Sequence, residues 1–242
     1  MQLNAAPASG TLPPPVGLAT LRVMFGKFTT PEVASLILAD PKEFWTKSER
    51  RTVTTLFADV RGFTSFAARV APEEALPTLN RIFAILCEVV ASEHGIVNRF
   101  LGDGMLAVFG TPFPLEDHAS AAARAALRAC AKMAQFADER RAQGREPLQI
   151  GLGLNTGSVI AGCIGTPERT EYTVVGHSVN VASRLVAIAE PGQILVGAGT
   201  AALVDESLAV HERGTVDLKG IGPTVVYELV DRPAQGMSRG RA

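Results

Sequence analysis

The feature that most restricts the fold of this chain is a pair of short apolar segments joined by an Asp-Gly turn. Residues 96–100 (IVNRF) and 105–109 (MLAVF) flank the tetrapeptide LGDG at 101–104. Apolar, β-branched runs of this length favour strands, and Asp-Gly between two of them favours a tight hairpin. The chain is therefore predicted to contain an antiparallel sheet, which needs a further layer to cover its apolar face.

The rest of the chain alternates irregularly between strand and helix patterns. Strands are predicted at 53–60, 172–175, 194–196 and 225–230, helices at 31–40, 72–94, 116–143 and 179–190, and a second hairpin at 148–155 and 158–164, turning at Thr156-Gly157. Gly95 is expected to end the helix that begins at Pro72. Helices and hairpins mixed in this way predict an α+β fold, a mostly antiparallel sheet flanked by helices.

Three regions differ in composition. Residues 1–44 are predicted to form a flexible leader followed by a short linker helix, in which Thr30 caps the first turn and Pro31 occupies it. Residues 45–231 form the main domain, and residues 232–242 form a disordered tail. The linker helix has no core of its own, so it must pack on the main domain or on a partner chain.

Composition narrows the class of protein. The formal net charge is −1, which argues against nucleic acid as the main partner. No apolar run reaches the roughly 18 residues that span a bilayer, and no signal-peptide pattern is visible at the N-terminus. The three cysteines (Cys87, Cys130 and Cys163) are widely spaced, as expected of reduced, buried thiols in a cytoplasmic protein.

Two carboxylates stand where two predicted strands end. Asp59 closes the strand at 53–60, and Asp103 occupies the hairpin turn. If that strand lies beside the hairpin, both acids point into one space, and two metal ions about 4 Å apart would balance their charge. The backbone N–H groups of Gly62, Phe63 and Thr64 would begin a helix there and offer an anion site. Taken singly, each Asp also fits a structural role, as a helix cap or a turn residue.

A third group of polar residues follows the strand at 172–175. Asn180 and Arg184 lie four residues apart on a predicted helix and so share one face. An amide and a guanidinium suit a sugar oxygen and a phosphate, although a capping Asn and a surface Arg would look the same in isolation. Lys219, beside Gly220, is placed to bind a terminal phosphate or simply to be solvated.

Taken together, these segments resemble the class III adenylyl/guanylyl cyclase homology domain. The matching stretches are LFADVRGFT (56–64), NRFLGDGM (98–105), YTVVG (172–176) running into VNVASR (179–184), and VDLKG (216–220). Four ordered motifs over residues 45 to 231 make a specific signal. The resemblance implies a ferredoxin-like, palm-type cyclase fold. It also implies an enzyme that converts ATP to cyclic AMP and pyrophosphate.

The resemblance also implies a role for each site residue. Asp59, Asp103 and the carbonyl of Val60 would hold two divalent ions, Mg²⁺ or Mn²⁺. Asn180 would orient the ribose and Arg184 would stabilise charge on the α-phosphate. Lys219 would bind the terminal phosphates.

Arg99 and Thr173 match the purine-reading pair of the family. Adenylyl members usually carry Lys at the position of Arg99, paired with Asp or, in one branch, with Thr or Ser; guanylyl members usually carry Glu. Arg99 keeps a donor for adenine N1, although an Arg fork also suits guanine O6 and N7. ATP is therefore the expected substrate, with a guanylate or mixed-specificity cyclase as the alternative.

The positions of these residues also predict a homodimer. Arg99 and Asp103 flank one tight turn, so they cannot readily serve opposite ends of one nucleotide. In the family each site lies between two chains, and this chain carries both sets of residues. An upstream sensor domain is expected if the chain is part of a longer protein. The alternatives are a diguanylate cyclase, disfavoured by the GDGM turn, and a non-catalytic nucleotide-binding or dimerisation module, disfavoured because no site residue is missing.

Overall fold

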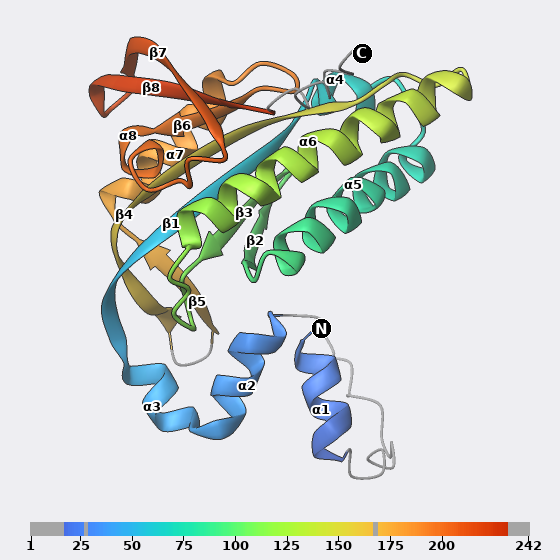
Figure 1. Ribbon diagram of the computed structural model, residues 1–242. Coiled ribbons are helices and arrows are strands. Elements are labelled where there is room, and N and C mark those ends of the chain that lie inside the picture. Colours follow the sequence, from blue (N-terminus) through green and yellow to red (C-terminus); the bar gives the residue numbers. More distant parts are fainter. Residues whose placement is uncertain (1–16, 27–28, 167–168, 232–242) are drawn as a thin grey trace, which may run out of the picture.

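A twisted eight-stranded sheet forms the centre of the computed structural model, which describes residues 17–26, 29–166 and 169–231 (Figure 1). Its order is β2-β3-β1-β4-β6-β8-β7, and β5 pairs with β4 off this path. The strands are β1 (Ser48–Arg61), β2 (Ile96–Leu101), β3 (Gly104–Phe109), β4 (Gln149–Thr166), β5 (Arg169–Val175), β6 (Ile194–Gly197), β7 (Ala209–Leu218) and β8 (Gly222–Val230). Within the described residues only β4 and β6 pair in parallel, so the predicted α+β fold with a mostly antiparallel sheet is confirmed.

Helices cover both faces of this sheet. They are α1 (Leu18–Phe25), α2 (Pro31–Ala39), α3 (Pro41–Thr46), α4 (Phe63–Ala67), α5 (Pro72–Ser92), α6 (His118–Ala142), α7 (His177–Ile188) and α8 (Ala198–Ala201). Helices α5 and α6 lie side by side over one face, and α1 to α3 form a group at the opposite end of the molecule from α4 (Figure 1). Alanine fills most of the buried side of α6, which lets that helix approach the sheet closely.

Strand β1 separates the two main cores by the alternation of its side chains. Leu56 and Val60 pack with α5 and α6, whereas Val53 and Phe57 pack with α2 and α7. Successive residues of a strand point to opposite faces, so a strand buried on both sides reads as a continuous apolar run. This explains why residues 53–60 could be recognised as a strand.

The predicted second hairpin is wrong. Residues 149–166 form the single long strand β4, which pairs antiparallel with the whole of β1. Gly157, taken as a turn residue, lies inside the strand opposite Val53. A Cβ at Gly157 would stand 2.8 Å from the side chain of Ser178 on α7, so the glycine permits a close helix–sheet contact instead of a turn.

The first hairpin and the end of α5 follow the prediction more closely. Strands β2 and β3 pair across the turn, and Gly102 takes the left-handed conformation there with φ of 64°. Helix α5 ends at Ser92, earlier than predicted, and His94 takes the left-handed position with φ of 58°. Gly95 follows, and a Cβ there would stand 2.4 Å from the Phe109 ring, so its role is to make room for that ring.

The linker helix forms as predicted and packs on its own chain. The side chain of Thr30 accepts a hydrogen bond from the Val33 amide at 3.3 Å, which caps the first turn of α2. Val33 and Ala34 are buried, and Val33 joins the core on the α7 side of the sheet. The tail at 232–242 and the leader up to residue 16 lie outside the described residues.

Helix α5 alone among the described helices is long and apolar enough to cross a membrane by length and composition. A core helix of a globular protein meets the same test, and Ile82, Leu86 and Val89 of α5 are buried in the main core. Cys87, also on α5, is a free thiol, as are Cys130 and Cys163. Burial raises the pKa of the Cys130 thiol to about 12, so this thiol stays protonated and unreactive.

Candidate active site

The two candidate metal-binding acids come together at one end of the sheet. Strands β1 and β3 pair so that Asp59 stands opposite Gly104, the residue after Asp103. The backbone N–H of Val60 donates to the carbonyl of Asp103 at 3.3 Å, which joins the turn to the strand. A Cβ on Gly104 would lie 2.9 Å from the carbonyl oxygen of Ala58, so a side chain at that position would push the turn away.

The electrostatics of Asp59 leave room for a cation. Burial raises the pKa of its carboxyl above the ordinary value, the guanidinium of Arg61 lowers it, and the carboxylate of Asp103 raises it again; the net shift is upward. By formal charge, the one guanidinium of Arg61 cannot neutralise the two carboxylates of Asp59 and Asp103 fully. Within the described residues no group of three His, Cys, Asp or Glu side chains could hold a metal ion. Two carboxylates and the Val60 carbonyl are hard oxygen donors that suit Mg²⁺ or Mn²⁺, whose remaining ligands would come from substrate phosphates and water.

Arg61 is a site neighbour that the sequence reasoning missed. Its Nη1 lies 3.2 Å from the Asp59 carboxylate, and its Nη2 donates to the carbonyl of Val186 on α7. Asp59 and Arg61 are two residues apart on one strand and therefore share a face, which was a signal available in the sequence.

The predicted anion site begins directly after β1. Gly62 takes a left-handed conformation with φ of 72° and precedes α4, whose first residues are Phe63 and Thr64. No side chain caps this helix by a hydrogen bond, and its first turn carries no acidic residue. The short helix thus begins beside Asp59 with its first backbone N–H groups unoccupied by a capping side chain.

The predicted purine-reading residues lie where β2 and β5 approach each other. Arg99 pairs with Glu171 at 2.8 Å, and its buried Nε has no hydrogen-bond partner among the residues that the structure describes. Thr173 is 5% exposed and donates to the Asn98 side-chain oxygen at 2.9 Å, while the Asn98 amide donates to the carbonyl of Tyr172 at 2.8 Å. The structure thus brings Arg99 and Thr173 into one region but gives each a different partner.

A pocket of about 730 Å³ adjoins this region. Arg99, Phe100 and Glu171 line it together with residues before and at the start of α2. Thr173 does not line it. Glu171 was missed because its pairing with Arg99 joins residues 72 positions apart in sequence, which no local pattern reveals.

Asn180 and Arg184 lie on the exposed side of α7. The opposite side of this helix is buried through Val181, Ala182, Leu185 and Val186. The Asn155 side-chain amide donates to the Ser178 carbonyl at 3.1 Å and fixes the start of the helix. The predicted sharing of one helix face is confirmed, but in the described chain no hydrogen bond or ion pair connects either residue to Asp59 or Asp103.

Lys219 occupies the turn between β7 and β8, directly after the buried Leu218. It is exposed there and is free to reach a ligand. The single chain therefore carries its predicted site residues in four places: the acids near the end of β1 and in the β2–β3 turn, the purine pair on β2 and β5, Asn180 and Arg184 on the exposed face of α7, and Lys219 in the β7–β8 turn.

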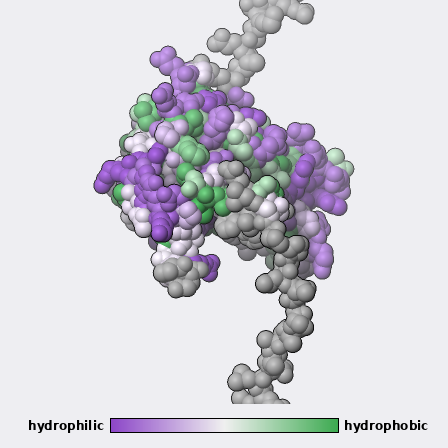
Figure 2. Space-filling model, turned by 90° about the horizontal axis from the view of Figure 1, so that it is seen from below, coloured by the Kyte–Doolittle hydropathy of each residue, from purple (hydrophilic) through white to green (hydrophobic). Residues whose placement is uncertain are grey.

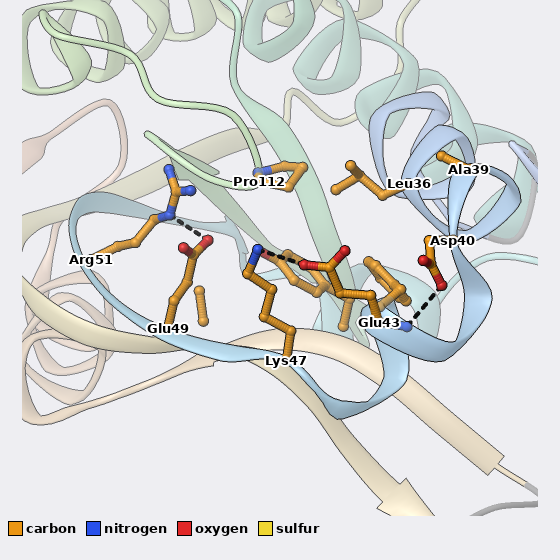
Figure 3. Close-up of a pocket in the computed structure, with 11 residues that line it drawn as sticks. Leu36, Ala39, Asp40, Glu43, Lys47, Glu49, Arg51 and Pro112 are labelled. Atoms are coloured by element: carbon orange, nitrogen blue, oxygen red, sulfur yellow. Dashed lines mark hydrogen bonds and ion pairs between the residues drawn. The ribbon is translucent and has the colours of Figure 1, made fainter.

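A second pocket, of about 260 Å³, lies between the linker helices and the start of β1 (Figure 3). Its cationic residues are already paired, Lys47 with Glu43 at 3.0 Å and Arg51 with Glu49. None of the predicted site residues lines it. Because both cations are paired and Asp40 adds a third carboxylate to the lining, this pocket offers no free cation for a nucleotide phosphate.

Comparison with known proteins identifies the family. Residues 46–231 match the model of the adenylate and guanylate cyclase catalytic domain. The chain belongs to the class III nucleotide cyclases. The predicted resemblance and its extent, residues 45 to 231, agree with this match, and all the predicted site residues fall inside it.

Curated relatives agree with the family but are longer than this chain. An uncharacterized protein of Mycobacterium tuberculosis is 37% identical over 183 residues, covering 74% of this chain and 31% of the relative. Adenylate cyclase 1 of Rhizobium meliloti is 32% identical over 184 residues, covering 75% of this chain and 28% of the relative. The chain thus spans about a third of the length of the curated relatives that it matches.

Two solved cyclase structures share the fold. The adenylyl cyclase CyaB from P. aeruginosa superposes with a TM-score of 0.74 at 30% identity, covering 78% of this chain and 98% of CyaB. The guanylyl cyclase Cya2 superposes with a TM-score of 0.72 at 33% identity, covering 78% of this chain and 97% of Cya2. Because these two neighbours use different purines, the overall likeness does not select between ATP and GTP.

Proposed function

We propose that this cyclase domain is an adenylate cyclase, converting ATP to 3′,5′-cyclic AMP and pyrophosphate. The observation that carries the proposal is the pairing of β1 with β3, which sets Asp59 opposite Gly104 and next to Asp103. This arrangement gives the domain an acidic centre with an incompletely balanced charge, as a metal-dependent phosphoryl site requires. The family membership supports cyclase chemistry, and the neighbouring residues decide the nucleotide.

We assign two divalent ions, Mg²⁺ or Mn²⁺, to Asp59, Asp103 and the carbonyl of Val60. When bound, such ions neutralise the triphosphate and activate the attacking hydroxyl. The protein residues supply positioning. Asn180 holds the ribose so that its 3′-oxygen faces the α-phosphorus.

The remaining charged groups act on the phosphates. Arg184 stabilises the charge that develops on the α-phosphate as the new bond forms and pyrophosphate leaves. Lys219 and the N–H groups of Gly62, Phe63 and Thr64 bind the terminal phosphates. No protein group needs to form a covalent bond in this scheme.

The working unit is proposed to be a homodimer. Within the described residues no hydrogen bond or ion pair joins the acids to the exposed face of α7, which supports a second copy completing each site. Ile160 and Val175 are cross-strand partners on β4 and β5, 41% and 55% exposed, and Ile164 on β4 is 47% exposed. Such a patch supports association, and Figure 2 displays apolar side chains interspersed in the mostly hydrophilic lower surface of the molecule.

ATP is proposed as the substrate because Arg99 presents donors to the purine. Nη2 of Arg99 pairs with the Glu171 carboxylate, which orients the guanidinium. The remaining N–H groups of the guanidinium are then proposed to donate to adenine N1. A mixed-specificity cyclase is the second candidate, favoured by this same pair. The carboxylate of Glu171 stands beside Arg99 as an acceptor that guanine N1–H and its amino group require.

The setting of the domain in its protein is also a proposal. The relatives are about three times longer than the matched region, which supports a further domain upstream, such as a sensor. The net charge of −1 supports a small nucleotide as the ligand and not nucleic acid. A cytoplasmic location for this domain would give it access to ATP.

The experiment that tests the proposal is product identification. Pure protein is incubated with ATP or GTP and with Mg²⁺ or Mn²⁺, and the products are separated and identified. Cyclic AMP and pyrophosphate in equal amounts are expected from ATP. Binding of nucleotide without any cyclic product would instead identify a non-catalytic module.

A further inference from the structure

Arg61 connects the acidic centre to a helix that carries other site residues. It is the last residue of β1, and its side chain is 21% exposed. Its Nη1 lies 3.2 Å from the Asp59 carboxylate. Its Nη2 donates to the carbonyl of Val186 in the last turn of α7. The planar guanidinium fork can hold both partners at once, which a single ammonium could not do equally well.

Two glycines of β4 make room for this connection. A Cβ on Gly151 would stand 2.5 Å from both Nε and Nη2 of Arg61, so the guanidinium lies directly on the strand. A Cβ on Gly153 would stand 2.3 Å from the Val186 amide nitrogen, so the backbone of α7 also lies directly on β4. The sheet thus accepts the helix and the guanidinium side by side on one face.

The end of α7 needs a cation from elsewhere in the chain. The last carbonyls of a helix lack intrahelical partners, and positive charge is favourable near them. Helix α7 has no basic residue in its last turn. The Ala189 amide shares the Val186 carbonyl at 3.3 Å, and Arg61 supplies a second donor.

We propose that Arg61 is a positioning residue that fixes the C-terminal end of α7 and thereby sets the direction of Asn180 and Arg184. Helix α7 spans 12 residues from His177 to Ile188. Because a helix of this length is rigid, anchoring one end fixes the orientation of the whole helix. The catalytic consequence rests on the proposed function. In a homodimer with shared sites, Arg61 stands beside the acids of one site and holds the helix that serves the other.

A first test needs neither metal nor nucleotide. Amide hydrogen exchange is measured for peptides covering residues 177–190 in the wild type, Arg61→Met, Gly151→Ala and Arg69→Met. Gly151→Ala pushes the guanidinium of Arg61 away from β4 but keeps the arginine and its positive charge in the protein. This variant therefore remains informative if Arg61→Met folds poorly. Arg69→Met is the matched control, because the Arg69 side chain pairs with the exposed Glu146 on the surface of the described chain.

Arg61→Met and Gly151→Ala are expected to speed exchange at the end of α7 by about tenfold or more, with Arg69→Met like the wild type. Unchanged exchange in both variants would overturn the proposal, whether or not the protein is a cyclase. This outcome is therefore separate from any failure of the proposed function.

A second test locates the effect in mixed dimers. One chain carries Asp103→Ala, so it supplies α7 but no working acids; the other carries Asn180→Ala, so it supplies the acids. Activity of this mixture first establishes that sites are shared. Arg61→Met is then added to the Asp103→Ala chain. In the control mixture, the Asp103→Ala chain carries Arg69→Met in place of Arg61→Met.

The predicted result is a fall in kcat of about tenfold or more, with KM for ATP changed less than about threefold. Asn180 and Arg184 act on the reacting groups, so misplacing them costs rate more than binding. Wild-type kcat in this arrangement would overturn the proposal.

Discussion

At the scale of single residues, Asp59 and Asp103 are the groups on which the proposed chemistry depends. Asp59→Ala or Asp103→Ala removes oxygen ligands from both ions. Metal-ion stabilisation of the transition state is worth several kcal/mol, so kcat/KM should fall by more than about a hundredfold. Asp138→Ala, at an exposed acid of α6 paired with Arg141, should keep full activity. Near-normal activity of either site variant at saturating metal would remove the metal assignment.

We expect Arg99 and its neighbours to decide the purine preference. Wild-type protein is expected to favour ATP over GTP by a modest margin, because a good bidentate contact discriminates by about 1–3 kcal/mol and Arg also donates to guanine. Arg99→Lys should keep or sharpen this preference. Arg99→Glu with Thr173→Cys supplies acceptors for guanine and should shift the ratio toward GTP.

Glu171 alters how that second variant must be built. In the wild type Arg99 forms an ion pair with Glu171. A glutamate at position 99 would instead place two negative charges close together, and these would repel each other. Glu171→Gln should therefore accompany Arg99→Glu. The measurement is the ratio of kcat/KM for ATP and GTP. If the ratio of kcat/KM for ATP and GTP is the same in the wild type and in every variant at Arg99, this residue does not read the purine.

At the scale of helices and strands, the sequence predicted best where an element has one dominant pattern. The apolar run of β1, the β2–β3 hairpin and the capped linker helix were predicted correctly, although the two residues that turn the hairpin are Gly102 and Asp103 and not the predicted Asp-Gly pair. Strand β7 was missed because it alternates exposed and half-buried positions and ends at Leu218 with little apolar content. The hairpin at Gly157 was predicted wrongly because the sequence does not distinguish a glycine in a turn from a glycine that allows a helix to pack closely on the strand.

The candidate site was predictable in its residues but not in their partners. Asp59 and Asp103 could be brought together because a strand end and a hairpin turn are local features. The pairs Arg99 with Glu171 and Arg61 with Val186 depend on how distant strands and helices pack. The assembled sheet places both pairs, and the glycines at 151 and 153 make room for the contact of Arg61 with Val186.

The start of α6 gives the fold a pH dependence. The His118 ring nitrogen Nδ1 lies 2.8 Å from the Thr54 hydroxyl, and burial lowers the pKa of His118 below 6.5, against a smaller opposing effect of Asp117. A lowered pKa in the folded state means that the unfolded chain takes up the proton first. This contribution to stability is present above about pH 6.5 and is lost as pH falls through the folded-state pKa.

Urea unfolding at a series of pH values between 7.5 and 5 tests this prediction. The free energy of unfolding should decrease over this range in the wild type and decrease less in His118→Gln, which keeps a hydrogen-bonding group without the titration. His211→Gln, at an exposed position of β7, serves as the control. Identical slopes for wild type and His118→Gln would show that His118 does not contribute.

At the scale of the whole molecule, the proposed site is completed by a second chain. Asp59 lies near the end of β1 and Asp103 in the adjacent β2–β3 turn, whereas Asn180 and Arg184 project from the exposed side of α7. Helix α2 packs on its own sheet, and we expect it to lie near the axis of the proposed dimer. The proposed homodimer contains two sites, each built from the acids of one chain and the helix of the other.

Mixing two inactive variants tests this account most directly. Asp59→Ala and Asn180→Ala proteins, each nearly inactive alone, are combined under conditions in which subunits exchange, and cyclic AMP formation from ATP is measured. Random exchange makes about half of the dimers mixed, and each mixed dimer has one intact site, so about a quarter of wild-type activity is expected. No recovery, with exchange demonstrated by differently tagged chains, would contradict the shared-site cyclase.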